Sequence, residues 1–334
     1  MTTTPACREL FESAIVIDGL DTSQWGSEAT YRKLREGGVT AINATLSVWD
    51  GFDALISNLG DWHGWFERFG DLIRPVRSLA DVKAAKEERR TGIIFGLQNP
   101  APIADDLRRV RLLQELGIRI VQLTYNERNL IGDGCYEPTD VGLSRFGLDV
   151  VGEMNEHRVL IDLSHCGERT TREAIEASEQ PVAVTHAGPK ARFRHPRNKE
   201  DETIRLLAEH GGVIGANAYP LFLPNGYDTT LREFVDGVEY LVELAGIDHV
   251  GIGTDFCEGR PPEWFRWVFA TSHGHRMPEH LPTLPDPHRQ LIGFEDQTHF
   301  IDLAEMLLDR GYAEEDVLKL LGGNWMRLLA AVCL

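Results

Sequence analysis

The stretch Val159–His186, VLIDLSHCGERTTREAIEASEQPVAVTH, contains two short apolar runs, and a histidine follows each of them. The runs are Val159–Leu163 and Pro181–Thr185, and the histidines are His165 and His186. Short runs rich in valine and isoleucine are typical of buried parallel strands. Further along the 334-residue chain in both directions, six more runs have this character: Ala14–Asp18, Val39–Thr45, Gly92–Leu97, Arg119–Thr124, Gly212–Ala216 and His249–Gly253.

Helical patterns separate most of these runs. In Asp106–Leu116 the apolar residues recur at helical spacing until Gly117 ends the pattern, and Phe146–Glu156 and Glu200–His210 behave likewise. Eight strands that alternate with helices predict a (β/α)₈ TIM barrel, a single α/β domain over residues 1–334. A doubly wound open sheet is the competing architecture. Its dinucleotide-binding version is disfavoured because no G-x-G-x-x-G follows the first run.

Two long connections interrupt the alternation of strands and helices. Trp49–Arg90, after the second strand, is an insertion in which we expect two helices. Glu258–Gln290, after the eighth strand, holds six prolines and the aromatic residues Trp264, Phe265, Trp267 and Phe269, and it shows little regular pattern. A loop of this length is usually a lid, a binding loop or an interface, and it follows a strand on the barrel face where active sites lie. Glu295–Ala331 reads as two or three closing helices.

Composition excludes several classes of partner. With 34 Lys and Arg against 52 Asp and Glu, the net charge is −18, which argues against a nucleic-acid binder and against an anionic membrane surface. No apolar run is long enough to predict a transmembrane helix, and the N-terminus lacks the pattern of a signal peptide. Five widely spaced cysteines without a C-x-x-C pair read as reduced thiols, so we expect a cytoplasmic protein.

Polar residues end several of the predicted strands, and in a barrel such positions face the ligand. His165 and His186 follow neighbouring strands, and Asp255 follows the eighth strand. Two imidazoles and a carboxylate form a plausible site for Zn²⁺, Fe²⁺ or Mn²⁺. For either histidine alone, a hydrogen-bonded core residue is the better interpretation, but the pair together with the aspartate makes a metal site an equally good interpretation.

These segments also carry a resemblance to a known family. The sequence resembles the renal (membrane) dipeptidases, peptidase family M19, within the amidohydrolase-type barrels. The matching segments occur in the expected order over nearly the whole chain: Val16–Gly19, Leu123–Asn126, Gly142–Gly147, Leu160–His165, Pro181–His186, Arg197–Asn198, Gly251–Phe256 and Gly323–Trp325.

The resemblance implies a two-zinc centre at which a metal-bridging hydroxide attacks the peptide carbonyl of a dipeptide. His165 and His186 match the two histidine ligands of one metal, and Asp255 matches the aspartate ligand that follows strand eight. Arg197 matches the arginine that binds the free carboxylate of the substrate, a role that suits a guanidinium. The resemblance also implies a homodimer.

The sequence departs from the family pattern at four positions. The His-x-Asp metal ligands are replaced by Leu20 and Thr22, the bridging glutamate by Gln98, and a histidine that contacts the substrate by Tyr125. Leucine cannot bind a metal, and glutamine offers a neutral oxygen without a bridging charge. Asp21 is a poor replacement, because adjacent residues of an extended segment face opposite ways. We therefore expect one divalent metal, Zn²⁺ in the first place with Fe²⁺ or Mn²⁺ as alternatives, on His165, His186 and Asp255, with Gln98 as a fourth ligand.

These observations lead to three alternative functions. The first is a mononuclear metal-dependent hydrolase of a small dipeptide-like or amide substrate, in which Asp255 binds the metal or acts as general base. Its substrate would carry an anionic group that binds to Arg197, and Tyr125, Asn217 and Tyr219 would shape the pocket. The second is a metalloenzyme of the same fold with lyase, isomerase or O₂-using chemistry, and the third is a metal-free binding protein.

Overall fold

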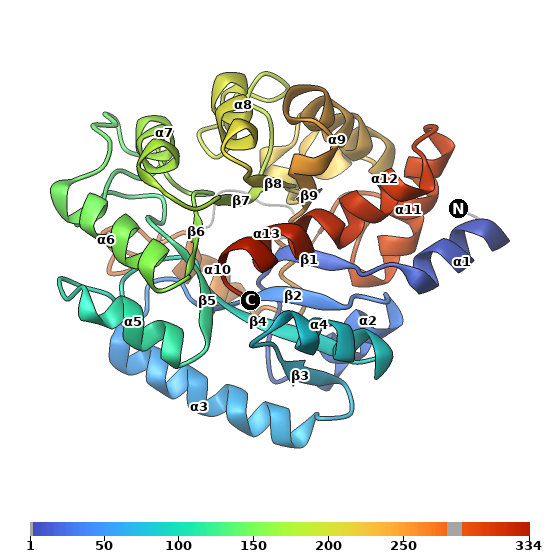
Figure 1. Cartoon of the computed structure of the whole chain (residues 1–334), viewed down its shortest axis with the longest axis horizontal. Helices are drawn as coiled ribbons and strands as arrows, with labels where there is room; N and C mark the ends of the chain where they lie inside the picture. Colours follow the sequence, from blue (N-terminus) through green and yellow to red (C-terminus); the bar gives the residue numbers. More distant parts are fainter. Residues whose placement is uncertain (1–2, 279–288) are drawn as a thin grey trace.

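The computed structural model describes residues 3–278 and 289–334, and within them eight parallel strands close into a barrel (Figure 1). The order of the strands around the barrel follows the chain, and the pairing of the second strand with the fourth completes the circle. The TIM barrel is therefore confirmed, and the open sheet is excluded. The barrel strands are β1 Ile17–Asp21, β2 Ala41–Ser47, β4 Thr91–Leu97, β5 Ile118–Gln122, β6 Leu160–Asp162, β7 Ala183–Ala187, β8 Val213–Ala216 and β9 Val250–Ile252.

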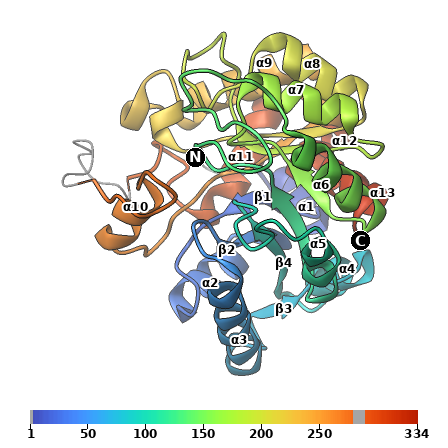
Figure 2. The ribbon, with the colours of Figure 1, turned by 90° about the vertical axis from the view of Figure 1, so that its left-hand side faces the viewer.

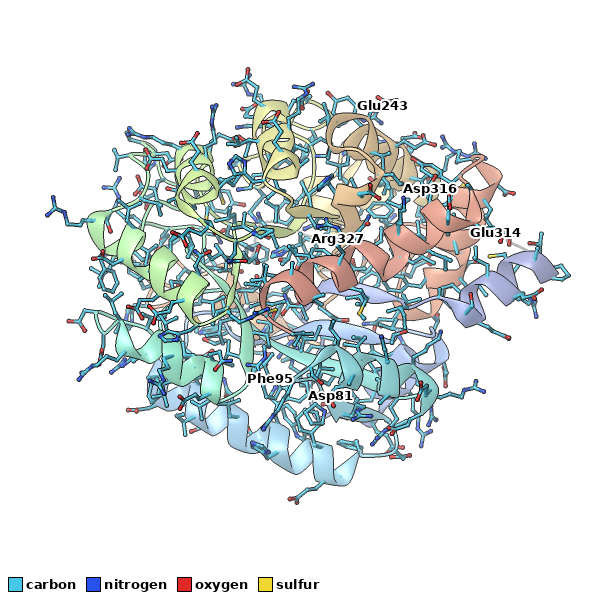
Figure 3. The ribbon with its side chains drawn as sticks, in the orientation of Figure 1. Asp81, Phe95, Glu243, Glu314, Asp316 and Arg327 are labelled. Atoms are coloured by element: carbon cyan, nitrogen blue, oxygen red, sulfur yellow. The ribbon has the colours of Figure 1, made fainter. Side chains whose placement is uncertain are left out.

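Helices pack around the barrel on its outside (Figure 2). Those that precede the last barrel strand are α1 Pro5–Ser13, α2 Glu28–Glu36, α3 Phe52–Arg68, α4 Leu79–Glu87, α5 Arg108–Glu115, α6 Arg145–Glu156, α7 Glu168–Ala177, α8 Asp201–Glu209 and α9 Leu231–Ala245. Short 3₁₀ turns lie at Pro220–Phe222, Gly226–Asp228, Ile247–His249 and Gln297–His299. Acidic side chains such as Glu243 and Glu314 are exposed on the outer helices (Figure 3). None of the helices in the described ranges is long and apolar enough to cross a membrane.

The insertion after β2 contains the two expected helices, α3 and α4, and in addition a strand that the sequence analysis missed. This strand, β3 Ile73–Pro75, pairs with the first residues of β4, whereas β5 pairs with the last residues of β4. It therefore extends the sheet outside the barrel. With three residues, of which the last is a proline, it is too short to show an alternating pattern.

The connection after β9 also differs from the expectation of little regular structure. It forms the helix α10 Pro262–Val268, which begins at a proline in the first helical position, where the missing N–H costs nothing. The aromatic residues of this connection thus lie on a helix above the barrel. The part of the predicted loop at residues 279–288 lies outside the described residues.

The C-terminal segment closes the end of the barrel at which the strands begin, which is called the lower end below. It forms α11 Phe300–Asp309, α12 Glu314–Leu318, a π-turn at Lys319–Gly323 and α13 Asn324–Val332. The ring of Trp325 on α13 is buried in the barrel, and its Nε1 donates a hydrogen bond to the carbonyl oxygen of Ile252 at 3.0 Å. Gly19 and Gly251 line the space that the ring occupies, since a Cβ atom at either position would lie 2.5 Å from it. The close approach of the indole therefore requires glycine at these two strand positions.

Candidate functional site

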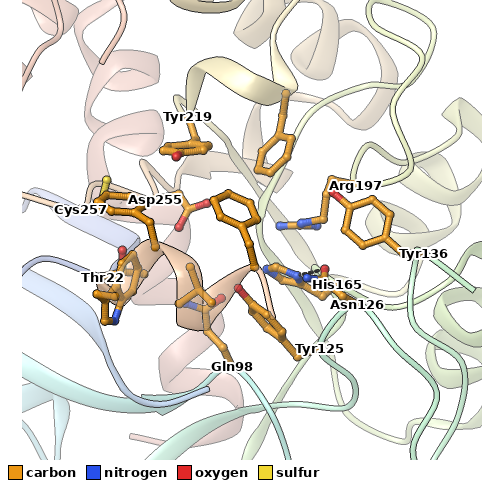
Figure 4. Close-up of a pocket in the computed structure, with 15 residues that line it drawn as sticks. Thr22, Gln98, Tyr125, Asn126, Tyr136, His165, Arg197, Tyr219, Asp255 and Cys257 are labelled. Atoms are coloured by element: carbon orange, nitrogen blue, oxygen red, sulfur yellow. Dashed lines mark hydrogen bonds between the residues drawn. The ribbon is translucent and has the colours of Figure 1, made fainter. Parts of the chain in front are cut away.

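At the opposite end of the barrel, the strand ends surround a cavity of about 490 Å³, a volume that includes the space open to solvent (Figure 4). Of the residues predicted for the site, six line this cavity: Gln98, Tyr125, His165, Arg197, Tyr219 and Asp255. Side chains of α10 cover it, namely Trp264, Phe265 and Val268, together with Phe269 directly after the helix. The connection after β9 thus contributes a wall of the site, as its position in the sequence predicted.

The two predicted histidines lie in direct contact. His165 follows β6 and His186 belongs to β7, and their Nε2 atoms are 3.0 Å apart. Nδ1 of His165 lies 2.7 Å from Oδ1 of Asn126, an acceptor, so Nδ1 carries the proton. Nδ1 of His186 lies 2.8 Å from the hydroxyl oxygen of Thr185, and this hydroxyl donates in turn to Asp162 at 2.7 Å. The Nδ1 of His186 is therefore also the protonated nitrogen.

This tautomer pattern makes the pair suitable for a metal ion. With the proton on Nδ1 of each ring, two Nε2 lone pairs face each other across 3.0 Å. Burial and the nearby charge of Arg197 lower the pKa of both histidines well below its ordinary value, so the rings stay neutral. Two nitrogen ligands at about 2.0–2.1 Å from a tetrahedral zinc ion lie about 3.3–3.4 Å apart, so only a small separation of the two rings is needed to admit the ion. The two imidazoles therefore fit one divalent cation.

Asp255, immediately after β9, occupies the opposite wall of the cavity (Figure 4). Its backbone has a φ of 59°, a left-handed conformation that non-glycine residues adopt mainly at functional or tightly constrained positions. Burial raises the pKa of its carboxyl to about 7, against the lowering effects of Arg197 and Asn217. This side chain can therefore hold or release a proton near neutral pH.

Gln98 and Asn217 supply amide groups at the ends of β4 and β8. The amide nitrogen of Gln98 donates to the hydroxyl of Thr45 at 2.9 Å, which fixes the side chain and leaves its carbonyl oxygen as an acceptor. The oxygen of Asn217 accepts the backbone N–H of Tyr219 at 2.6 Å and so orients the following turn. Of these two amides, Gln98 lines the cavity.

Arg197 brings a buried positive charge to the cavity. Its guanidinium donates to the backbone carbonyls of Ser164 and, at 3.1 Å, of His186, and it is 1% exposed. Lys199, also buried, is held by a carbonyl and a hydroxyl. Within residues 3–278 and 289–334 neither cation forms an ion pair. This side of the cavity therefore favours an anionic group.

Tyr125 stacks on the imidazole of His165, with ring centroids 4.2 Å apart and an interplanar angle of 23°. Sequence reasoning missed its neighbour Asn126, which holds Nδ1 of His165. Asn126 has a φ of 62°, and asparagine tolerates this conformation better than most residues. Tyr136 and Phe222 were missed as well, since both lie in long connections with no pattern that points to the cavity.

The side chains of the strand-one positions are apolar or are bonded to other groups of the protein. Leu20 is buried, and Thr22, which lines the cavity, donates its hydroxyl to the carbonyl oxygen of Phe256 at 2.9 Å. Asp21 faces away from the cavity, where it accepts hydrogen bonds from the backbone of Ser23 and, at 2.8 Å, from Gln297. In the described part of the chain, no three His, Cys, Asp or Glu side chains are grouped closely enough to hold a metal by themselves.

Comparison with known proteins gives an independent view of this site. The sequence pattern of the membrane dipeptidases, peptidase family M19, matches residues 8–265. The chain is 30% identical to dipeptidase aclJ of Aspergillus oryzae over 277 residues, which cover 81% of this chain and 59% of that protein. It is 28% identical to dipeptidase verJ of Clonostachys rogersoniana over 275 residues, which cover 81% of this chain and 63% of that protein. The chain thus spans about three fifths of the length of these relatives.

Among solved structures, an amidohydrolase from Pseudomonas aeruginosa is similar along the entire chain. The two sequences are 39% identical, the TM-score is 0.92, and the match covers 98% of this chain and 99% of the other. The similarity therefore includes both the barrel and the connections that form the cavity.

Proposed function

The chain belongs to the membrane dipeptidase family, peptidase family M19, and on that basis we propose that it is a metal-dependent hydrolase of a small dipeptide-like or amide substrate. The observation that carries the proposal is the pair of neutral imidazoles whose Nε2 atoms face each other at 3.0 Å. A single divalent ion suits this pair, and Zn²⁺ is our first choice because imidazole is among its usual ligands. Fe²⁺ and Mn²⁺ are the alternatives that metal analysis would distinguish.

A metal at this position supplies a water of lowered pKa and polarises the carbonyl of the substrate. The remaining functions belong to side chains of this protein. Arg197 would bind the anionic end of the substrate, and Asn126 and Thr185 hold the two imidazoles in the tautomer that binds a metal. Asp255, on the opposite wall of the cavity, would take up a proton from the attacking water. The α10 side chains limit the access of bulk water.

The proposal is tested by loading the purified protein with excess Zn²⁺ and counting metal per chain. We expect about one equivalent, because Leu20 and Thr22 cannot bind a second ion. We also expect weak hydrolysis of ordinary dipeptides, since each 1.4 kcal/mol of lost transition-state stabilisation costs about tenfold in rate.

Asp21→Asn is the matched control, because Asp21 faces Gln297 rather than the cavity and its replacement should leave the metal count unchanged. Two equivalents of zinc, with turnover of dipeptides comparable to that of a family member with all ligands, would contradict the mononuclear site. Absence of hydrolysis across dipeptides and simple amides would contradict the proposed reaction. A cytoplasmic location and a homodimer remain predictions from the sequence.

Arg197→Met should weaken the binding of an acidic ligand by about 1.5–3 kcal/mol, the range for a hydrogen bond to a charged group. This corresponds to about a tenfold to hundredfold rise in the dissociation constant of a carboxylate-bearing substrate analogue, measured by calorimetry. Arg194→Met removes an exposed arginine of the same connection and serves as the control. Equal affinity of the wild-type protein and the Arg197 variant, at equal melting temperature, would show that the carboxylate binds elsewhere.

A further inference from the structure

A second cavity, of about 670 Å³, lies beside the one described above, and its walls are unusually rich in tryptophan. Five of the seven tryptophans of the chain line it: Trp25, Trp62, Trp65, Trp264 and Trp267. Polar groups of Asp50, Asp61 and Arg260 complete its rim. Aromatic walls with a few polar groups at the edge are typical of small-molecule sites.

Two helices from distant parts of the chain contribute to the walls of this tryptophan-lined cavity. α3 contributes Trp62 and Trp65, and α10 contributes Trp264 and Trp267. In both pairs the spacing is three residues, which places both rings on one face of their helix. The connections after β2 and β9 thus each direct a pair of indoles at the same space.

These four rings differ from the other tryptophans in their hydrogen bonding. Trp25, Trp49 and Trp325 each donate their indole N–H to a backbone carbonyl oxygen at 2.9–3.1 Å. Within the described residues, the N–H groups of the two helix pairs have no such partner. Of the four, Trp65, Trp264 and Trp267 are half-buried and line the cavity with rings that the core does not enclose, whereas Trp62 is 1% exposed and packs in the hydrophobic core behind them.

The second cavity adjoins the catalytic cavity. Trp264 lines both, so that one ring forms a shared wall. Arg260, whose guanidinium lies 4.6 Å from the ring centroid of Trp264, donates from Nε to the carbonyl oxygen of Thr22, and Thr22 lines the catalytic cavity. In Figure 4 Thr22 and Arg197 lie on opposite sides of the catalytic cavity. The second cavity is therefore on the side away from the proposed carboxylate anchor.

We propose that the tryptophan-lined cavity is a substrate subsite that binds a planar aromatic group on the acyl side of the scissile amide. The inference rests on the proposed function, because it takes Arg197 as the anchor for the carboxylate end of the substrate. A substrate held at that end extends across the histidine pair toward Thr22, and a flat ring on its other end reaches the indoles beyond Trp264. The substrate class is then an amide or dipeptide whose N-terminal residue or acyl group is aromatic.

The test compares the binding of two probes, 2-naphthoylglycine and acetylglycine, which share the glycine carboxylate and differ in the acyl group. Calorimetry on the wild-type protein should show at least about tenfold tighter binding of the naphthoyl probe, since stacking on indole rings favours a flat aromatic group. Trp65→Ala should remove most of this ratio and leave the affinity for acetylglycine unchanged, because Trp65 lines only the second cavity.

Phe66→Ala is the matched control, since Phe66 is a half-buried aromatic residue on the same helix and lines neither cavity. In this variant the ratio of the affinities for the two probes should equal that of the wild-type protein. A naphthoyl preference that survives Trp65→Ala would overturn the inference, as would equal affinity of the wild-type protein for both probes. The proposed hydrolysis is tested separately. Absence of turnover on dipeptides and amides would contradict it, whatever the ratio of the affinities for the two probes.

Discussion

Replacing His165 and His186 together by alanine is expected to abolish zinc binding and to lower the rate of hydrolysis a hundredfold or more. The two Nε2 atoms form the only pair of imidazole nitrogens within 3.0 Å of each other in the described residues, so no other histidine can substitute for them. Loss of the metal removes both the activation of water and the polarisation of the carbonyl, which together are worth several kcal/mol. Metal analysis and kcat/KM on the same preparation measure the two effects.

His63→Ala is a suitable control for this double variant. His63 is exposed on α3, and it lines neither the catalytic cavity nor the second cavity. We expect its metal content and activity to stay close to those of the wild-type protein. If the double variant retained one equivalent of zinc and its activity, the histidine pair would be a hydrogen-bonded core feature, which was the alternative interpretation of each histidine alone.

Replacing Trp325 by alanine is expected to lower the free energy of unfolding by about 3–5 kcal/mol, the range for truncating a buried large aromatic residue. The indole fills the lower end of the barrel against Gly19 and Gly251, and its N–H is bonded to the end of β9. In urea denaturation, the loss would appear as a lower midpoint concentration of urea, with an unchanged dependence of the free energy of unfolding on urea concentration.

Trp267→Ala provides the comparison for this effect. Trp267 is also a tryptophan, but it is half-buried at the rim of the second cavity, so its truncation should cost much less stability. Equal losses in the two variants would contradict the assignment of Trp325 as the residue that closes the barrel.

The fold could be predicted from sequence because its barrel strands are short apolar runs with helices between them. All eight runs correspond to strands, with shifts of a few residues at their ends. β3 was not predicted because a three-residue strand that ends in proline is too short to show an alternation of apolar and polar residues. α10 escaped because aromatic residues and prolines in a long connection give no clear helical pattern, although Pro262 occupies a favourable first position.

Only part of the functional site could be predicted from the sequence, for a physical reason. His165, Asp255 and Arg197 occur within recognisable segments near strand ends, and the structure brings them to one cavity. Asn126 could have been suspected, since it follows Tyr125 directly and asparagine is frequent in left-handed conformations. The tautomers of the histidines depend on the hydrogen bonds of Asn126 and Thr185, and such bonds are visible only in three dimensions.

The contact between α13 and the lower end of the barrel has a consequence for how such a protein can evolve. The side chains that hold the strands together there, with Trp325 between Gly19 and Gly251, lie at the end remote from the catalytic cavity. Selection for a stable barrel therefore acts on one set of positions, and selection for a reaction acts on another. Leu20 and Thr22 occupy the same segment as Gly19, yet Thr22 lines the catalytic cavity and Gly19 lines the space around the indole. A lineage can thus lose or exchange metal ligands without passing through unfolded intermediates.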